Sequence, residues 1–557
     1  MDIKDRLILN LGNYQTYVDE RLKLWTNMNF IRRLWVKDSS LWFPDPVSEI
    51  TNRLGWLTLP EIMHGQLDGL MSFAEGIKAE GVRNIVLLGM GGSSLAPEVF
   101  QKTFRNAPGY PELVVLDSTH PAAVLFIENK IDPRSTLFLV CSKSGTTLET
   151  LSFFRYFWQK VSQVTDTPGR HFVAITDPGT PLEQLAQERG FRRVFKANTD
   201  VGGRYSALTF FGLVPAALIG VKIHQLVDCA WIASESCEFC VPEEESPGLI
   251  LGAALGELAK NGRDKVTFFA SPSLKSFPAW LEQLIAESTG KAGKGIIPIV
   301  DEPPMSPEVY GEDRLFVGFF LEDDNNNELN EKFKALETAK HPTIRINLME
   351  KTDLGQEIFN WEVAIASAGA LLGIHPFNQP DVQLAKDLAR EAMEKREKIK
   401  IQSDILIEIV VAKDTEALTQ ALRTWFAQAQ VGDYTAIQAY LPPTPETTAA
   451  LQKIRLKILS RLRLATTVGY GPRFLHSTGQ LHKGGPNTGL FLQLVDEPAE
   501  DILIPETDYT FGALIHAQSV GDYRALKQRE RRVLRINLKD DVVGRLTRLM
   551  ELIRDLD

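Results

Sequence analysis

Two loops rich in glycine and hydroxyl side chains stand out in the first third of the chain. GMGGSSLAP (89–97) and CSKSGTTLET (141–150) each follow a short apolar run and precede an amphipathic segment. Glycines let the backbone turn tightly and approach a ligand, and the start of a helix offers free N–H groups with a partial positive charge. Serine and threonine hydroxyls add further donors. This combination predicts binding of a phosphate group.

Each loop also has a simpler interpretation. A glycine-rich turn needs no ligand, and one hydroxyl can cap a helix by itself. The first loop departs from the dinucleotide-binding pattern GxGxxG, because Ser94 stands where the third glycine should fall. The second loop places four hydroxyl residues around one glycine and the cation of Lys143, which is more than a helix cap requires. If both loops lie at one edge of a parallel sheet, they form a crevice suited to phosphate.

The elements that must hold these loops are predicted from short β-branched runs alternating with amphipathic segments. The first series of runs lies at 84–90, 112–117, 135–142, 172–177 and 192–197. A second series lies at 265–271, 314–320, 342–348 and 373–377. Such alternation is typical of parallel sheets covered by helices on both faces. We therefore predict an α/β fold of tandem three-layer sandwiches.

The chain divides into four predicted segments, at 1–75, 76–240, 241–400 and 401–557. The first is expected to be helical, the next two are sandwiches, and a charged helix at 387–403 leads into the last, which we call the C-terminal unit. This unit echoes the second sandwich, since Arg-Ile-Asn-Leu occurs at both 345–348 and 535–538. Four shared residues can arise by chance, so a partial repeat and an independent α/β unit both stay open.

Composition excludes several classes of protein. The 557 residues include 61 basic and 71 acidic side chains, for a net charge of −10, which argues against a nucleic-acid partner. No uncharged apolar stretch of about 20 residues occurs, so we expect no membrane span. The N-terminal residues do not resemble a signal peptide, and four cysteines suit a reducing compartment. We therefore expect a cytoplasmic protein.

Three further motifs follow the two loops in order: GGRYSALTFFGLVPAALIG (202–220), AESTGKAGKG (286–295) and GIHPFNQPDVQLAK (373–386). Together the five motifs resemble the sugar-isomerase domains of the glucose-6-phosphate isomerase family, over roughly residues 80–390. The tail at 469–489 is similar to the isomerase half of transaldolase–isomerase fusion proteins. The resemblance implies tandem sugar-isomerase domains that reversibly convert glucose 6-phosphate to fructose 6-phosphate through an enediolate, in glycolysis and gluconeogenesis. It implies no cofactor and no metal.

The resemblance also implies roles for individual residues. Its phosphate-contacting positions fall on Gly92, Ser93, Ser142, Lys143, Ser144 and Thr147. Arg204 matches the arginine that stabilises the enediolate, and Glu287 matches the carboxylate that moves a proton between C1 and C2. Lys386 matches a lysine involved in ring opening. Gln379 matches a glutamine that reaches the phosphate.

One family feature is missing, namely the ring-opening histidine in a Gly-Gln-His motif between the glutamate and the lysine. That interval holds only His341 and His375, and neither has the motif. Gly-Gln recurs far downstream as Gly479-Gln480, two residues before His482. Another histidine, His476, lies six residues before His482. Our hypothesis is that the C-terminal unit folds back to supply the histidine. The choice between His476 and His482 stays open.

Two other functions fit the same motifs. One is a dual isomerase that also accepts mannose 6-phosphate, since both substrates need the same phosphate site and base. The other is a non-catalytic regulator that binds a sugar phosphate. The joint presence of Arg204, Glu287 and Lys386 argues against the regulator, because binding alone needs no base. The expected partner is a small sugar phosphate, with neither nucleic acid nor membrane. The family is usually dimeric, which implies a homodimer.

Overall fold

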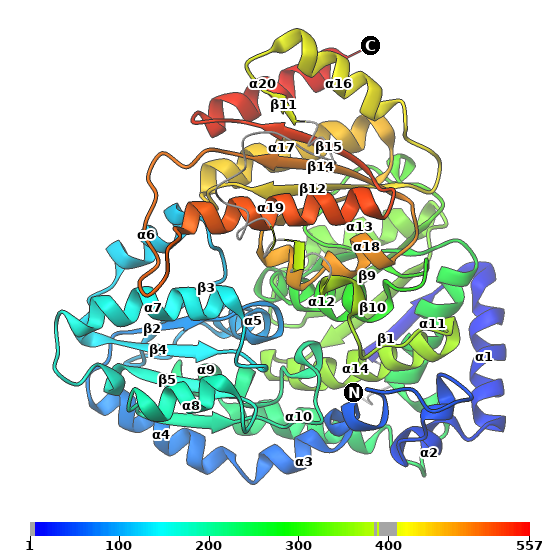
Figure 1. Ribbon diagram of the computed structural model, residues 1–557. Coiled ribbons are helices and arrows are strands. Elements are labelled where there is room, and N and C mark those ends of the chain that lie inside the picture. The colour runs from blue at the N-terminus through cyan, green and yellow to red at the C-terminus, as the bar shows by residue number, and fades with distance from the viewer. Residues whose placement is uncertain (1–5, 384–386, 389–390, 392–408, 557) are drawn as a thin grey trace.

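Three five-stranded sheets, each flanked by helices, form three lobes of the computed structural model (Figure 1). The structure describes residues 6–383, 387–388, 391 and 409–556. The first and second sheets form the two lower lobes in this view, and the third lobe lies above both. The predicted α/β class is confirmed. The charged helix expected at 387–403 falls almost wholly outside the described residues.

The first sheet brings the two glycine-rich loops to one edge. Its order is β3-β2-β4-β5-β6, with all neighbours parallel. The strands are β2 (Asn84–Leu88), β3 (Glu112–Leu116), β4 (Thr136–Cys141), β5 (Phe172–Thr176) and β6 (Arg193–Lys196). Since β2 lies between β3 and β4, the connections leave it in opposite directions. The carboxyl ends of β2 and β4 therefore flank a topological switch point, where α/β proteins bind ligands.

The second sheet has the order β1-β10-β9-β7-β8. Its strands are β7 (Lys265–Ala270), β8 (Ile297–Ile299), β9 (Arg314–Leu321), β10 (Thr343–Leu348) and β1 (Leu7–Asn10). The β1 strand corrects the expectation of a wholly helical N-terminal segment. Its residues are alternately half-buried and exposed, and it pairs antiparallel to β10 at the sheet edge. A four-residue run is too short for its periodicity to reveal a strand.

One predicted strand does not form. Residues 373–377 make a loop after α14 (Leu354–Leu372), which ends at Gly373 in the left-handed conformation (φ +64°). Burial of Ile374 and Phe377 explains why the run is apolar without being part of a sheet. This loop leads into the segment that contains Gln379.

The third sheet repeats the strand order of the second. Its strands are β11 (Ile409–Val411), β12 (Tyr434–Tyr440), β13 (Ala465–Tyr470), β14 (Gly489–Val495) and β15 (Arg532–Asn537). The order β11-β15-β14-β12-β13 matches β1-β10-β9-β7-β8 strand for strand. The two Arg-Ile-Asn-Leu segments occupy corresponding strands, β10 and β15. One difference is that β1 is antiparallel to its neighbour, whereas β11 is parallel. This shared topology supports a partial repeat.

Helices cover these sheets. In the first two lobes they are α1 (Gln15–Asn27), α2 (Phe30–Trp35), α3 (Leu59–His64), α4 (Leu67–Ala79), α5 (Leu95–Phe104), α6 (Pro121–Lys130), α7 (Leu148–Ser162), α8 (Pro181–Glu188), α9 (Phe210–Leu218), α10 (Ile223–Glu235), α11 (Pro247–Lys260), α12 (Phe277–Thr289), α13 (Asn327–Thr338) and α14. The third lobe has α16 (Thr415–Phe426), α17 (Pro445–Leu462), α18 (Gly479–Gly484), α19 (Phe511–Gln528) and α20 (Val542–Asp555). Within the described residues, no helix is both long and apolar enough to cross a membrane.

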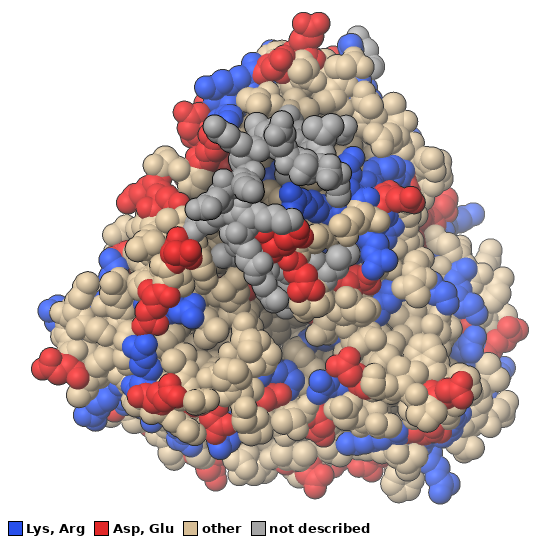
Figure 2. Space-filling model, in the orientation of Figure 1, with Lys and Arg blue, Asp and Glu red and all other residues tan. Residues whose placement is uncertain are grey.

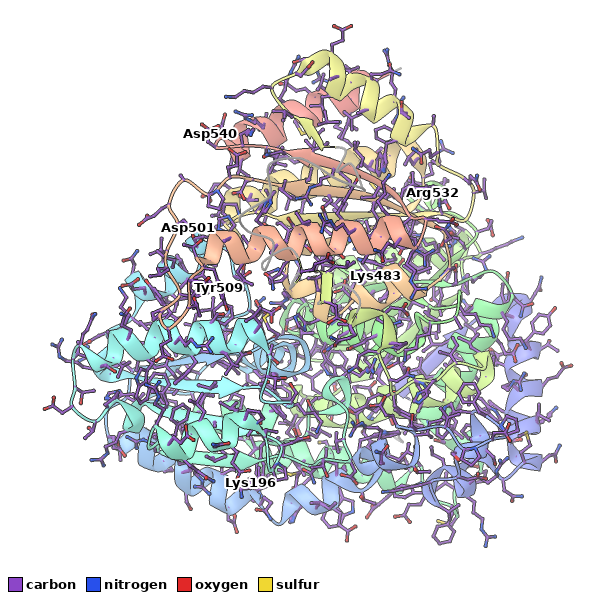
Figure 3. The ribbon with its side chains drawn as sticks, in the orientation of Figure 1. Lys196, Lys483, Asp501, Tyr509, Arg532 and Asp540 are labelled. Carbon is purple, nitrogen blue, oxygen red and sulfur yellow. The ribbon has the colours of Figure 1, made fainter. Side chains whose placement is uncertain are left out.

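The C-terminal unit packs on the first lobe through apolar side chains. Ile504, Phe511 and Leu514 belong to the same buried cluster as Phe153 and other residues of the first lobe. They come from α19 and from the long connection before it, which reaches down toward α7 (Figure 1). Asp501 and Tyr509 mark this connection in Figure 3. On the face shown in Figure 2, acidic and basic side chains are intermixed, unlike the uniform basic surface of nucleic-acid-binding proteins.

Burial of Glu357 on α14 makes stability depend on pH. The residue is 5% exposed, and burial raises its pKa from 4.5 to about 7, although Asn360 Nδ2 donates to it at 3.3 Å. Because the folded chain holds this proton more tightly, the stabilisation is complete below about pH 4.5. It is lost as the pH rises through about 7. The difference amounts to at most about 3 kcal/mol.

We therefore expect Glu357→Gln, which stays neutral, to raise the melting temperature relative to the parent at pH 8 but not at pH 5. Glu331→Gln, at an exposed position on α13, is the control and should show no such pH dependence. Melting curves at both pH values test this. An equal effect of Glu357→Gln at pH 5 and pH 8 would contradict it.

Candidate active site

The first glycine-rich loop contacts two distant parts of the chain. It forms a short 3-10 helix, Gly91–Ser93, between β2 and α5. A Cβ at Gly92 would collide with the carbonyl oxygen of Gly203. A Cβ at Gly91 would lie 2.7 Å from the carbonyl oxygen of His476. The glycines are therefore needed because other backbone segments pack directly on them. Gly92 and Ser93 thus lie beside Arg204 and beside the C-terminal unit.

The hydroxyls of the second loop pair with one another. Ser142 Oγ lies 2.8 Å from Thr147 Oγ1, and Ser144 Oγ lies 3.0 Å from Thr146 Oγ1. Thr147 is the N-cap residue of α7, but its side chain makes no capping hydrogen bond. The simpler interpretation, that these hydroxyls serve to cap the helix, therefore fails for Thr147. The first N–H groups of α7 have no side-chain cap from Thr147 and could donate to an anion.

Lys143 differs from its neighbours. Its ammonium group donates to both carboxylate oxygens of Asp177, each at 2.7 Å, and to the Asn198 carbonyl oxygen at 2.9 Å. An ammonium group has three donors, and all three are used here. This side chain therefore has no donor left for a phosphate. The charge of Lys143 holds the loop onto the first sheet, and its contact with phosphate stays a prediction.

Arg204 lies in the 3-10 helix Gly203–Tyr205 and is 2% exposed. Its NH2 atom donates to the carbonyl oxygens of Phe377 (3.0 Å) and Asn378 (2.9 Å) and to Gln379 Oε1 (2.8 Å). Its NH1 atom is buried without a hydrogen-bond partner and lies 3.9 Å from Glu287 Oε2. An unsatisfied buried donor on a guanidinium is costly. NH1 is therefore suited to a substrate oxygen.

Glu287 lies near the C-terminal end of α12 and is 8% exposed. Gln283, one turn earlier, donates through Nε2 to Glu287 Oε2 at 2.9 Å and to the His476 carbonyl oxygen at 2.8 Å. Sequence reasoning missed Gln283, although its spacing of four residues places it on the same helix face. It links the expected base to the C-terminal unit.

The structure distinguishes the two candidate histidines. His476, in the 3-10 helix Arg473–His476, has Nε2 3.0 Å from Glu149 Oε1. An ionised carboxylate can only accept a hydrogen bond, so an ionised Glu149 would select the tautomer with hydrogen on Nε2 and leave Nδ1 as the basic nitrogen. Gln518 Nε2 also donates to Glu149, at 2.8 Å. Glu149 belongs to the CSKSGTTLET motif, but sequence reasoning did not single it out.

His482 belongs to the interior of the C-terminal unit. Gln438 Nε2 lies 3.2 Å from its Nδ1, and its ring packs against Phe474 and Phe491. Burial lowers its pKa well below the usual value, so it stays neutral. Lys483, labelled in Figure 3 near α18, is its neighbour in this interior and forms an ion pair with Asp522. The structure therefore does not bring His482 to the other candidate residues.

The two histidines of the expected interval also have structural partners. His341 Nε2 lies 3.0 Å from the Pro307 carbonyl oxygen, and His375 Nε2 lies 2.8 Å from that of Ser48. Of the four histidines weighed, His476 is the one placed against the first loop. Lys386 lies outside the described residues.

Comparison with known proteins identifies the family. A family model described as phosphoglucose isomerase matches residues 68–305. A probable glucose-6-phosphate isomerase of Haloquadratum walsbyi is 30% identical over 341 residues, covering 55% of this chain and 78% of that protein. This chain belongs to the phosphoglucose isomerase family. The glucose-6-phosphate isomerase of Rubrobacter xylanophilus, another relative, is 29% identical and covers 61% of this chain and 89% of its own length.

Two solved structures resemble this chain in fold. A hypothetical protein from Thermus thermophilus is 27% identical, with a TM-score of 0.60 over 69% of this chain and 99% of that chain. A glucose-6-phosphate isomerase from Chlamydia trachomatis is 20% identical, with a TM-score of 0.53 over 67% of this chain and 79% of its own. The latter shares the fold.

Proposed function

We propose that this protein interconverts glucose 6-phosphate and fructose 6-phosphate. The observation that carries the proposal is a buried carboxylate, Glu287, facing the unpartnered NH1 of a buried arginine, Arg204. Aldose–ketose isomerisation needs a base to move a proton and a cation to stabilise the charge that develops on oxygen. Both groups lie beside a loop suited to phosphate.

The phosphate is anchored at the switch point of the first sheet. Ser142, Ser144 and Thr147 supply hydroxyl donors, and the loop at Gly92 and Ser93 supplies a close backbone approach. Anchoring this end of the substrate places the other end, C1 and C2, toward Arg204 and Glu287. Positioning of this kind lowers the entropic cost of the chemical step.

Ring opening is assigned to His476. As the C1–O5 bond breaks, the anomeric hydroxyl loses a proton and the ring oxygen gains one. The Nδ1 atom of His476 takes or returns a proton, and the carboxylate of Glu149 stabilises the imidazolium that forms. The resemblance adds Lys386 as a second participant in this step, which stays a prediction.

Isomerisation follows on the open chain. Glu287 removes the proton from C2, and the negative charge of the enediolate is stabilised by the NH1 atom of Arg204. Glu287 then returns the proton to C1, while the C1 oxygen gains a proton and the C2 hydroxyl loses one. Gln379 holds Arg204 in place. Its predicted contact with phosphate stays a prediction.

The phosphate site predicts the effect of removing its hydroxyls. Ser142→Ala combined with Thr147→Ala should raise KM by about 10-fold or more per hydroxyl, because each hydrogen bond to a phosphate contributes about 1.5–3 kcal/mol. Steady-state kinetics and binding of inorganic phosphate measure this. Thr165 and Thr167 form a hydroxyl pair on the surface, with oxygens 3.4 Å apart, and alanine at both positions is the control. Unchanged phosphate binding in the first double variant would place the anchor elsewhere.

The proposed reaction is tested by following both sugars directly. The protein should convert glucose 6-phosphate to fructose 6-phosphate and exchange the C2 hydrogen with solvent deuterium. Comparable turnover of mannose 6-phosphate would identify a dual isomerase. Tight binding of either sugar phosphate without turnover or exchange would refute the proposal in favour of a non-catalytic regulator.

A further inference from the structure

A second buried cation lies close to the proposed base. Lys291 follows Glu287 by four residues, just after α12 ends at Thr289, and is 5% exposed. Its ammonium group donates to the backbone carbonyl oxygen of His375. Lysine is almost never fully buried without a partner, because removing its charge from water is costly. Its position therefore needs a reason.

The partner of Lys291 belongs to the same segment that binds Arg204. Lys291 holds the carbonyl of His375, and two residues later the carbonyls of Phe377 and Asn378 accept from Arg204. The His375 ring is fixed separately by the Ser48 carbonyl oxygen, 2.8 Å away. The segment 375–379 is thus clamped at its start by Lys291 and at its end by Arg204.

This clamp determines where the second nitrogen of the guanidinium points. A guanidinium is planar and rigid, so fixing NH2 on three acceptors fixes NH1 as well. NH1 then lies 3.9 Å from Glu287 with no other partner. If segment 375–379 moved, NH1 would move with it.

The charges around Lys291 belong to the same site. Arg204, Glu287, Glu49 and Asp381 all act on it electrostatically. Burial, together with the charge of Arg204, lowers the pKa of Lys291 well below its usual value. Lys291 therefore shares its surroundings with both Arg204 and Glu287.

We infer that Lys291 is a positioning residue for the isomerisation: by holding the His375 carbonyl, it sets the segment that directs Arg204 NH1 toward the reacting end of the substrate. This rests on the proposed function. Arg204 NH1 is needed most when negative charge develops, so loss of Lys291 should affect the transition state more than substrate binding.

The same loop provides a matched control. Lys294 is exposed and donates to the carbonyl oxygen of Leu372 at 2.8 Å. Leu372 is the last residue of α14, three residues before His375. Both lysines therefore tie the loop after α12 to the chain around residues 372–375. Lys291 differs in being buried beside Arg204 and Glu287.

The test compares Lys291→Met, Lys291→Arg and Lys294→Met in the full chain. Lys291→Met should lower kcat by up to about 10²-fold, the cost of a small misplacement in a site, with KM for glucose 6-phosphate nearly unchanged. It should also weaken binding of a phosphorylated five-carbon aldonate, whose planar carboxylate resembles the enediolate, without weakening binding of inorganic phosphate. Lys291→Arg should restore part of both losses, and Lys294→Met should match the parent.

Several outcomes would overturn the inference. They are a parental kcat in Lys291→Met, equal losses in the two methionine variants, or a loss of phosphate binding that parallels the loss of kcat. If Lys291→Met does not fold, Lys291→Gln, which keeps a donor for the carbonyl, is measured in the same way. A parent that does not isomerise glucose 6-phosphate would refute the proposed function instead. Aldonate binding by the Lys291 and Lys294 variants would still show whether the two lysines differ.

Discussion

Glu287→Gln should lower kcat by about 10²–10⁴-fold and leave KM nearly unchanged. Glutamine keeps the shape of the side chain and can still accept a hydrogen bond from Gln283, but it cannot take a proton from C2. Exchange of the C2 hydrogen with solvent should fall in parallel with turnover. Both quantities can be followed in one reaction in deuterated buffer.

Glu282→Gln is the matched control for this substitution. Glu282 lies on the same helix, α12, but its carboxylate accepts a hydrogen bond from Ser477 Oγ at 3.4 Å rather than contacting Arg204. Turnover of this variant should stay near the parental value. If C2 exchange persisted in Glu287→Gln, the base would have to be reassigned.

The second large effect is expected at His476. His476→Gln should reduce turnover of glucose 6-phosphate by about 10²-fold, within the range for loss of a positioned acid or base. A shorter aldose phosphate, with too few carbons to close a ring, should lose much less, because only ring opening needs this proton transfer. Steady-state kinetics on both substrates measure the difference.

His482→Gln is the control for His476→Gln. His482 is neutral and packed inside the C-terminal unit, so this substitution should lower the melting temperature without a specific loss of kcat. Equal kinetics of both single variants and of the double variant would refute the role of His476. The same would follow if His476→Gln lost activity equally on cyclic and open-chain substrates.

Local sequence patterns were enough to predict the α/β fold class and the positions of the two glycine-rich loops. Short β-branched apolar runs and amphipathic segments predict strands and helices to within a few residues. The carboxyl ends of β2 and β4 were therefore placed correctly, and with them GMGGSSLAP and CSKSGTTLET. The order of motifs along the chain was enough to indicate the family.

The positions of individual polar side chains, in contrast, depend on contacts between distant parts of the chain. The spacing of His476 and His482 cannot show that one contacts Glu149, 327 residues away in sequence, and the other Gln438. In the same way, apolar 373–377 forms a buried loop rather than a strand, because its carbonyls bind two buried cations. Lys143 pairs with Asp177 for a similar reason, since that carboxylate lies within its reach. The position of a polar side chain depends on which partner lies nearest in space, and the local sequence does not identify that partner.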